Sequence, residues 1–200
     1  ITNGTSSSSN NSNSNSGAVY IYKRTGTSWT QEAYIKASNS GVNDTFGSYV
    51  ALDNDTLAVT ARQEDSNQTT ITNGTSSSSN NSNGNSGAVY IYKRTGTTWA
   101  QEAYIKASNN DENDYFGHST ALDDDTLAVG AYREDSNQTT ITNDNSSSSD
   151  NSRSASGAVY VYKRTGTSWA QEAYIKSSNN DNGANGYSDS FGFRIALDNE

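Results

Sequence analysis

Residues 9–29 read SNNSNSNSGAVYIYKRTGTSW, and this stretch changes character near its midpoint. Its first part is low-complexity Ser and Asn, the composition of a disordered linker. Its second part begins a β-branched and aromatic run that is typical of a strand. The same join recurs at residues 83–99 and 153–169. A repeated unit must therefore explain why a polar tract leads directly into a strand.

The unit is 70 residues long, a period that indicates a repeat architecture. GAVY begins at Gly17, Gly87 and Gly157. The FG dipeptide begins at Phe46 and Phe116, but in the third copy only at Phe191, so that copy carries five extra residues. The insertion lies in SNNDNGANGYSDS, a stretch with the composition of a loop.

Each period predicts four strands and no helix, because β-branched and aromatic residues dominate the apolar runs. FGSYVALD and TLAVTA are joined by the tight turn Asp53-Asn54-Asp55, and GAVYIYKR and WTQEAYIKA by a loop in which Gly26 supplies a positive φ. VYIY and TLAV are apolar on both faces, a pattern that suits sheets covered on both sides.

These patterns predict an all-β fold of tandem four-stranded antiparallel blades of about 70 residues, β-propeller-like. A string of independent β domains is the alternative, but such short units would have thin cores. We expect the last two strands of one blade in 1–45, complete blades in 46–115 and 116–190, and the first strand of a further blade in 191–200. Stacking permits either a closed ring or an open array.

The stretches FGSYVALDNDTLAVTARQEDSN (46–67), FGHSTALDDDTLAVGAYREDSN (116–137) and the GAVYIYKR strands resemble the FG-GAP repeat family, the blades of integrin-α-type β-propellers. The overall form is similar to the bacterial surface-protein variety. The resemblance implies blades, an extracellular or cell-surface setting, and binding or scaffolding roles without enzyme activity. Gly130-Ala131 stands at the family's GA(P) position, Thr60-Ala61 departs from it, and the Pro is missing from both.

Family members often carry a D-x-D-x-D-G-x-x-D calcium loop between the first two strands, and the resemblance does not extend to it. The corresponding turns are only Asp53-Asn54-Asp55 and Asp123-Asp124-Asp125, too short for a calcium cage of six to eight oxygens. A separate calcium candidate is Asp181, Asn185 and Asp189, whose alternative is a polar turn-forming loop. No cofactor is certain, and calcium is the one left open.

Composition excludes several classes of protein. The net charge of −9 argues against nucleic-acid binding, and the Lys-Arg pair of each repeat indicates a solvated turn rather than a phosphate site. The absence of Cys excludes disulfides and thiolate metal sites. No apolar run is long enough for membrane insertion. The chain begins inside a repeat, so we expect it to be a piece of a longer or processed chain.

Catalytic residues are not indicated. The single histidine, His118, occupies a position held by Ser48 in the first repeat, so we expect it to be variable and surface-facing. Acidic residues recur at every turn, so no carboxylate pair stands out as catalytic. The recurring Glu64-Asp65-Ser66-Asn67 segment suits a solvated acidic turn, with weak cation binding as the alternative. We predict that the protein is not an enzyme.

Glycosylation is the modification that the sequence favours. The acceptor pattern N-x-[S/T] occurs at nine asparagines, most of them in the Ser/Asn-rich segments. They are Asn3, Asn10, Asn43, Asn54, Asn67, Asn73, Asn80, Asn137 and Asn145. The Ser/Asn tract is either a neutral loop copied by duplication or a glycan-bearing, partner-contacting surface.

Two functions remain open. The first is a non-enzymatic extracellular structural or adhesive protein, in which stacked blades form a scaffold or filament with polar, glycosylated loops and the partner is the protein itself. The alternative is a ligand-binding propeller module of a cell-surface adhesion protein that depends on calcium. Near-identity of the repeats favours the first, and divergent loops would favour the second.

Overall fold

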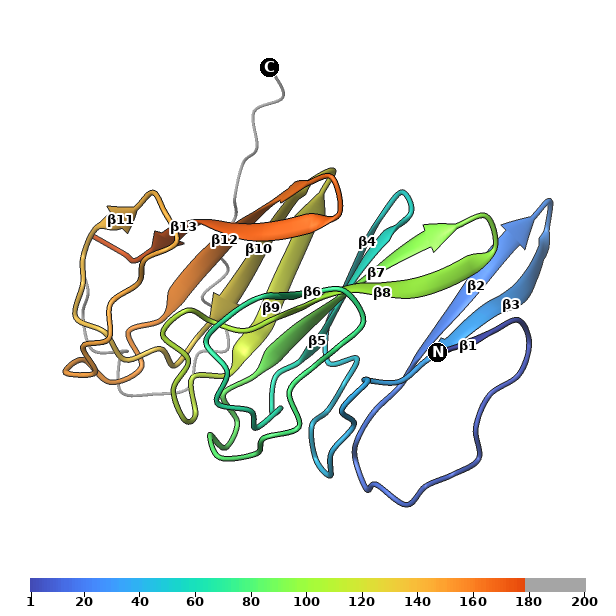
Figure 1. Cartoon of the computed structure of the whole chain (residues 1–200), viewed down its shortest axis with the longest axis horizontal. Coiled ribbons are helices and arrows are strands. Elements are labelled where there is room, and N and C mark those ends of the chain that lie inside the picture. Colours follow the sequence, from blue (N-terminus) through green and yellow to red (C-terminus); the bar gives the residue numbers. More distant parts are fainter. Residues whose placement is uncertain (179–200) are drawn as a thin grey trace.

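A computed structural model describes residues 1–178, and its regular structure is entirely β-sheet (Figure 1). These residues form thirteen strands in three sheets with antiparallel pairing, and they include no helix and thus none suited to cross a bilayer. The all-β prediction is confirmed. Figure 1 shows the sheets standing side by side in an open row, with the long loops projecting from one side.

The three sheets share one plan. The first has the order β1-β3-β2 and comprises β1 (Thr2–Asn3), β2 (Val19–Thr25) and β3 (Ser28–Ile35). The second has the order β4-β5-β7-β8-β6 and comprises β4 (Val50–Asp53), β5 (Thr56–Ala61), β6 (Thr72–Asn73), β7 (Ala88–Thr95) and β8 (Thr98–Ile105). The third has the order β9-β10-β12-β13-β11 and comprises β9 (Phe116–Asp123), β10 (Thr126–Ala131), β11 (Ile141–Thr142), β12 (Ala158–Thr165) and β13 (Ser168–Ile175).

The connection between β5 and β7 contains a strand that the sequence pattern did not predict. The short strand β6 pairs with β8, with Thr72 opposite Tyr104, so the chain travels from the middle of the sheet to its outer edge and back. Each five-stranded sheet therefore contains the four predicted strands and one further short edge strand. Two residues are too few to show a period, which is why the pattern missed it.

Both predicted hairpin turns are present. Asn54 adopts φ 49° between β4 and β5, Gly26 adopts φ 61° between β2 and β3, and its counterpart Gly96 adopts φ 64° between β7 and β8. Asn and Gly tolerate this left-handed region better than other residues. The first strand differs between copies, because β9 begins at Phe116 whereas β4 begins only at Val50. In the second sheet the Tyr49 N–H donates to the Thr60 hydroxyl at 3.1 Å, while the Thr60 N–H donates to the Tyr49 carbonyl at 3.0 Å.

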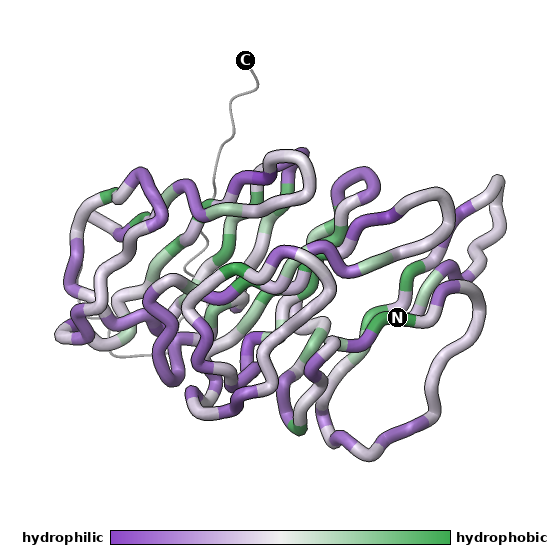
Figure 2. Tube along the Cα trace, in the orientation of Figure 1, coloured by the Kyte–Doolittle hydropathy of each residue, from purple (hydrophilic) through white to green (hydrophobic). Residues whose placement is uncertain are grey.

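The apolar core lies between the sheets and not within any one of them. Along β7, Tyr90 and Tyr92 pack in the junction with the first sheet, whereas Val89 and Ile91 pack in the junction with the third. Alternate side chains of a strand point to opposite faces, so one strand serves both junctions. Figure 2 shows the apolar residues concentrated in the strands and the polar ones in the loops. The predicted burial of both strand faces is confirmed.

The FG dipeptide closes each junction. Phe46 is buried, and its ring meets the Tyr90 ring edge-on at 5.2 Å between centroids. Its backbone N–H donates to the Ser16 carbonyl of the preceding repeat. Phe116 makes the corresponding ring contact with Tyr160, also at 5.2 Å. Each sheet is thus tied to its neighbour from the first residue of the repeat.

Candidate functional site at the sheet junctions

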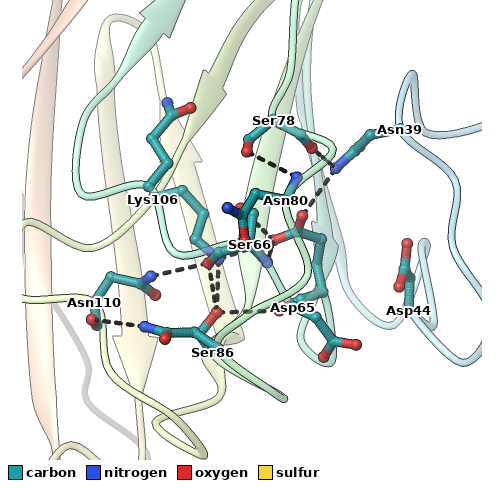
Figure 3. A network of polar contacts seen from close by, with 12 residues as sticks. Asn39, Asp44, Asp65, Ser66, Ser78, Asn80, Ser86, Lys106 and Asn110 are labelled. Atoms are coloured by element: carbon teal, nitrogen blue, oxygen red, sulfur yellow. Dashed lines mark hydrogen bonds and ion pairs between the residues drawn. The ribbon is translucent and has the colours of Figure 1, made fainter.

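A buried ion pair lies at the base of both junctions, and Figure 3 shows the polar network around the pair next to the first sheet. Lys106 Nζ donates to Glu64 Oε2 at 2.8 Å, and their side chains are 0% and 1% exposed. Lys106 Nζ also donates to Ser86 Oγ at 2.8 Å, and Ser66 Oγ donates to the same Glu64 oxygen at 3.0 Å. The expectation of a solvated acidic turn at residues 64–67 is wrong for Glu64, because its carboxylate is buried and accepts hydrogen bonds from Lys106 and Ser66.

The third sheet carries the same arrangement. Lys176 Nζ donates to Glu134 Oε2 at 2.5 Å and to Ser156 Oγ at 2.6 Å, and the Tyr174 hydroxyl donates to Glu134 Oε1 at 2.8 Å. Burial lowers the pKa of Lys106, while the facing Glu64 carboxylate acts in the opposite direction and raises it. Removal of one member would leave the other as an uncompensated buried charge, which would cost about 3–5 kcal/mol.

Asn39 links this ion pair to the preceding sheet. It lies in the connection between β3 and β4, and its Nδ2 donates to Glu64 Oε1 at 2.8 Å and to the Ser78 carbonyl at 2.5 Å. Its Oδ1 accepts the Tyr90 hydroxyl at 2.5 Å. Asn109 repeats all three contacts at the next junction, with Glu134, Ser148 and Tyr160. Each junction therefore combines apolar packing with a set of polar contacts that we call the inner lock. Its members are Asn39, Glu64 and Lys106 at one junction and Asn109, Glu134 and Lys176 at the other.

A second lock lies toward the outer edge of the sheets. Arg94 Nη2 on β7 donates to Glu32 Oε1 on β3 at 2.6 Å, and the Trp99 indole N–H donates to Glu32 Oε2 at 3.1 Å. The hydrogen bond from Arg94 is the main cause that lowers the pKa of Glu32. Arg164, Glu102 and Trp169 repeat the arrangement. The prediction that the Lys-Arg pair is a solvated turn is wrong for these arginines.

Asn3 and Asn73 complete the outer lock. Asn3 Oδ1 accepts the Trp99 backbone N–H at 2.8 Å, and its Nδ2 donates to the Trp99 carbonyl at 3.4 Å. Asn73 makes the same pair of bonds with Trp169, at 2.8 and 3.3 Å. The side-chain amide thus makes the same pair of hydrogen bonds with the Trp backbone of the next sheet that the backbone of an adjacent strand would make. Both asparagines are predicted glycan acceptors, and the Nδ2 atom that would carry the sugar is engaged here.

The Ser/Asn tract packs over the junction before re-entering the sheet. Ser77 Oγ lies 2.8 Å from Ser38 Oγ, whose proton is donated to Gln101 Oε1. Ser147 and Ser108 repeat this contact at the next junction. Within the tract the Asn80 side chain accepts the Ser82 N–H, an Asx-type turn. The expectation of a disordered linker is therefore wrong for this connection, which has defined contacts.

The loop side of the junctions is where the repeats differ. A groove of about 690 Å³ opens between the first and second sheets and is lined mainly by amide side chains and small residues. Its lining is Asn15, Gly17, Val42, Asn43, Thr45, Gln63, Asp65, Gly84 and Asn85. At the next junction Tyr115 and Arg133 stand where Thr45 and Gln63 line this groove. The Arg133 guanidinium carbon lies 5.3 Å from the ring centroids of both Tyr115 and Tyr132.

His118 belongs to this divergent region. Its ring lies 4.2 Å from the Tyr132 ring and 5.6 Å from the Tyr49 ring, and it is half-buried between them. The expectation that His118 faces the surface is wrong in that respect.

The structure describes the predicted glycan acceptors but not the predicted calcium site. All nine acceptor asparagines are exposed. The calcium candidate Asp181, Asn185 and Asp189 lies outside the described residues. Within residues 1–178 no cluster of three or more His, Asp or Glu side chains is placed to hold a metal ion. Glycan attachment and calcium binding therefore stay predictions.

Sequence reasoning missed the lock residues Glu32, Asn39 and Asn3. Their signal was present, because Glu102, Asn109 and Asn73 recur at the same positions of the second repeat. Recurrence alone did not distinguish them from the many other copied polar residues. Only their partners, which lie in the neighbouring repeat, identify what they do.

Comparison with known proteins agrees with this arrangement. The sequence model of the FG-GAP repeat matches residues 29–92 and 99–162. No curated protein sequence matches the chain. Each matched segment runs from the Trp of one sheet to the second Tyr of the next sheet's long strand, so each begins in one sheet and ends in its neighbour.

Proposed function

Because the chain belongs to the FG-GAP repeat family, we propose that it is a non-enzymatic structural or adhesive protein of the cell surface or extracellular space. Its β-propeller-like blades stack into a scaffold, and the polar loops form the outer coat. The partner in this role is the protein itself. FG-GAP repeats are typical of extracellular or surface proteins, which supports the setting.

The observation that carries the proposal is the repetition of both locks. The recurring side chains of Glu64 and Lys106 are buried and paired with each other, and Glu64 also accepts the Asn39 side-chain N–H from the connection that leaves the preceding sheet. Arg94 and Glu32 are used in the same way at the outer edge. Recurring charged side chains that are engaged in structural contacts suit a protein built by stacking. Few of them are left to take part in catalysis.

Electron microscopy of the native, untagged material tests this role. Continuous filaments with an axial repeat set by the blades would support a scaffold, with the Ser/Asn loops on the outside. Discrete ring-shaped particles would contradict a filament and favour a closed propeller. Labelling of intact cells with an antibody against residues 5–12 would test the external location, and staining only after permeabilisation would contradict it.

A second candidate function is ligand binding at the loop side, as in a calcium-dependent adhesion module. It is favoured by one observation, the exchange of Thr45 and Gln63 for Tyr115 and Arg133 in otherwise nearly identical repeats. Aromatic rings beside an arginine suit stacking on sugars or on a partner's side chains.

The test is a glycan-array comparison of the wild type with Tyr115→Thr/Arg133→Gln, which gives the second repeat the residues of the first. Loss of binding in the double variant would support the second function. Repeating the assay with a calcium chelator would separate a calcium-dependent site from an independent one. Absence of binding to any glycan by the wild type would count against it.

A further inference from the structure

Two predicted glycan-acceptor positions lie on either side of the Ser run and recur in the first two repeats. One is Asn3 and Asn73, in the sequence Asn-Gly-Thr, and the other is Asn10 and Asn80, in the sequence Asn-Asn-Ser. All four asparagines are exposed, and all four fit the acceptor pattern N-x-[S/T]. Neither sequence nor exposure therefore separates the two positions, and the difference lies in their hydrogen bonds.

At the first position the side-chain amide belongs to the outer lock. Asn73 Oδ1 accepts the Trp169 N–H at 2.8 Å, and its Nδ2 donates to the carbonyl of the same residue at 3.3 Å. Two bonds to one backbone residue use a single edge of the amide, where the oxygen and the proton on its side of the nitrogen lie next to each other. Asn3 uses the same edge for Trp99.

An N-linked sugar would occupy this edge of the amide. Attachment converts the side chain into a secondary amide, which places its two carbon substituents trans. The sugar C1 is then trans to Cβ and on the same side as Oδ1, where Asn73 carries the proton that it donates to Trp169. Because the sugar would replace this donor between the second and third sheets, glycan attachment to Asn73 and closure of the outer lock exclude each other.

At the second position the amide nitrogen is free. Asn80 Oδ1 accepts the N–H of Ser82, the last residue of its own acceptor sequence, at 3.0 Å. Its Nδ2 donates to none of the residues 1–178. Asn10 and Ser12 repeat this turn at 2.9 Å. A hydrogen bond to the amide oxygen polarises the amide, and both of its protons remain available for substitution.

We propose that N-linked sugars attach to this chain at Asn10 and Asn80, and that Asn3 and Asn73 stay unmodified because they belong to the outer lock. The proposal rests on the extracellular setting given above and names the positions that carry the sugar coat. The sugar donor is a lipid-linked oligosaccharide diphosphate. The bond from Nδ2 to the sugar C1 forms, the bond from C1 to the donor phosphate breaks, and one amide proton leaves with the released diphosphate.

The third repeat provides a control within the chain. Asp150 occupies the position of Asn80, and its Oδ1 accepts the Ser152 N–H at 2.7 Å, so the turn is kept. Asp150 has no amide nitrogen and accepts no N-linked sugar. The Ser/Asn tracts project from one side of the row of sheets (Figure 1), so sugars on the first two tracts would leave the sheet-to-sheet contacts intact.

Site occupancy on the secreted chain tests the proposal. The 200-residue chain with an added secretion leader is expressed in a host that attaches N-glycans. Peptide N-glycosidase in heavy-oxygen water then marks each occupied asparagine of the folded fraction, and fragment mass spectra locate the marks. We expect marks at Asn10 and Asn80 and none at Asn3 and Asn73. A mark at Asn73 in the folded fraction, or an unmarked Asn80, would overturn the proposal.

Asn73→Asp and Asn80→Asp test the reason for the exclusion in unglycosylated protein. Both exchange the amide nitrogen for oxygen and add the same charge, but only the first removes a donor to Trp169. We expect N73D to lower the urea midpoint and N80D to leave it unchanged, because Asp150 shows that the turn accepts aspartate. A midpoint of N73D equal to that of the wild type would show that the outer lock does not need this proton and would overturn the proposal.

The native material separates this inference from the extracellular role on which it rests. Sugars on Asn80 in both the native and the secreted recombinant chain would support both. A native chain without sugars, beside a recombinant chain marked at Asn80, would count against the extracellular setting, while the choice of Asn80 over Asn73 would stand. A recombinant chain that is unmarked at Asn80 would reject the site assignment whatever the native chain carries.

Discussion

Among single residues, Gly87 shows most directly why the GAVY motif begins with glycine. Its φ is +86°, and a Cβ placed there would lie 2.0 Å from the Phe116 carbonyl oxygen. Gly17 has the same relation to the Phe46 carbonyl, also at 2.0 Å. The backbone of one repeat thus touches the FG dipeptide of the next, and no side chain fits between them.

We predict that Gly87→Ala is markedly more destabilising than Gly96→Ala. Gly96 has a similar positive φ of +64°, but no atom lies within 4 Å of its Cβ position. The control should cost about 1–2 kcal/mol for the left-handed backbone alone. Gly87→Ala adds about 1–3 kcal/mol from the steric clash. Urea unfolding measures both, and equal losses would show that the close approach does not matter.

Asp114 is a buried acid with an unusual environment. It is 2% exposed, and burial is the main cause that raises its pKa to about 8, with repulsion from Glu134, Asp111 and Asp135 acting in the same direction. The corresponding Asp44 has its pKa raised to about 6, again mainly by burial. Each folded carboxyl therefore keeps its proton at pH values where the unfolded chain has lost it.

We predict that Asp114 makes stability fall as the pH rises. Its contribution is complete below the unfolded pKa of 3.8 and is lost as the pH passes about 8. The slope is about 1.4 kcal/mol per pH unit. Asp114→Asn should remove that slope, so its unfolding free energy relative to wild type should rise from pH 5 to 8. Asp44→Asn should show the same trend only up to about pH 6, and parallel profiles for Asp114→Asn and wild type would contradict this.

Among the elements, the first two Ser/Asn tracts have the same sequence but different contacts. Residues 1–13 and 71–83 are identical, as ITNGTSSSSNNSN. In the second copy Ser77 and the Ser78 carbonyl contact Ser38 and Asn39 of the preceding sheet, and both serines are half-buried. In the first copy Ser7 and Ser8 are exposed. Identical residues thus have different surroundings.

We predict that a non-specific protease cuts residues 5–12 about tenfold faster than residues 75–82. Cleavage requires local opening, and an added cost of about 1.4 kcal/mol from the extra contacts corresponds to that ratio. Mass spectrometry of early fragments measures the two rates in one reaction. Because the sequences match, protease preference cannot cause a difference, and equal rates would mean that the tract contacts contribute nothing.

For the whole molecule, stability resides in the contacts between neighbouring sheets. Both apolar clusters draw residues from two sheets, and the contacts of Asn39 with Glu64 and of Arg94 with Glu32 also cross from one sheet to the next. A 70-residue unit buries little by itself, so the stack behaves as units with nearest-neighbour coupling. A change at a junction should therefore affect two sheets at once.

We predict that Trp99→Ala destabilises the monomeric chain by about 3–5 kcal/mol, because Trp99 is 3% exposed and fills a junction. Trp29→Ala, at the corresponding position of the first sheet, should change stability by less than about 0.5 kcal/mol, because Trp29 is 66% exposed. Thermal unfolding in dilute solution, where copies do not associate, provides the comparison. Similar losses for both variants would place the stability within sheets instead.

Features that depend on local chemistry can be predicted from the amino-acid sequence. The strand runs, the turns at Asn54 and Gly96 and the burial of both faces of TLAV follow from residue type and spacing over a few positions. The FG and GAVY repeats also set the period, because copied residues must occupy copied positions. A two-residue strand such as β6 lies below what such patterns resolve.

Which polar residues contact one another follows from the packing of the sheets and not from the local sequence. Lys106 and Glu64 are 42 residues apart, and Arg94 and Glu32 are 62 apart in different repeats, so no local pattern links them. The packing also decides that Tyr20 is exposed while Tyr90, in an identical stretch, is buried. Burial and pairing of a side chain depend on the neighbouring sheet, which is formed by residues far away in the sequence.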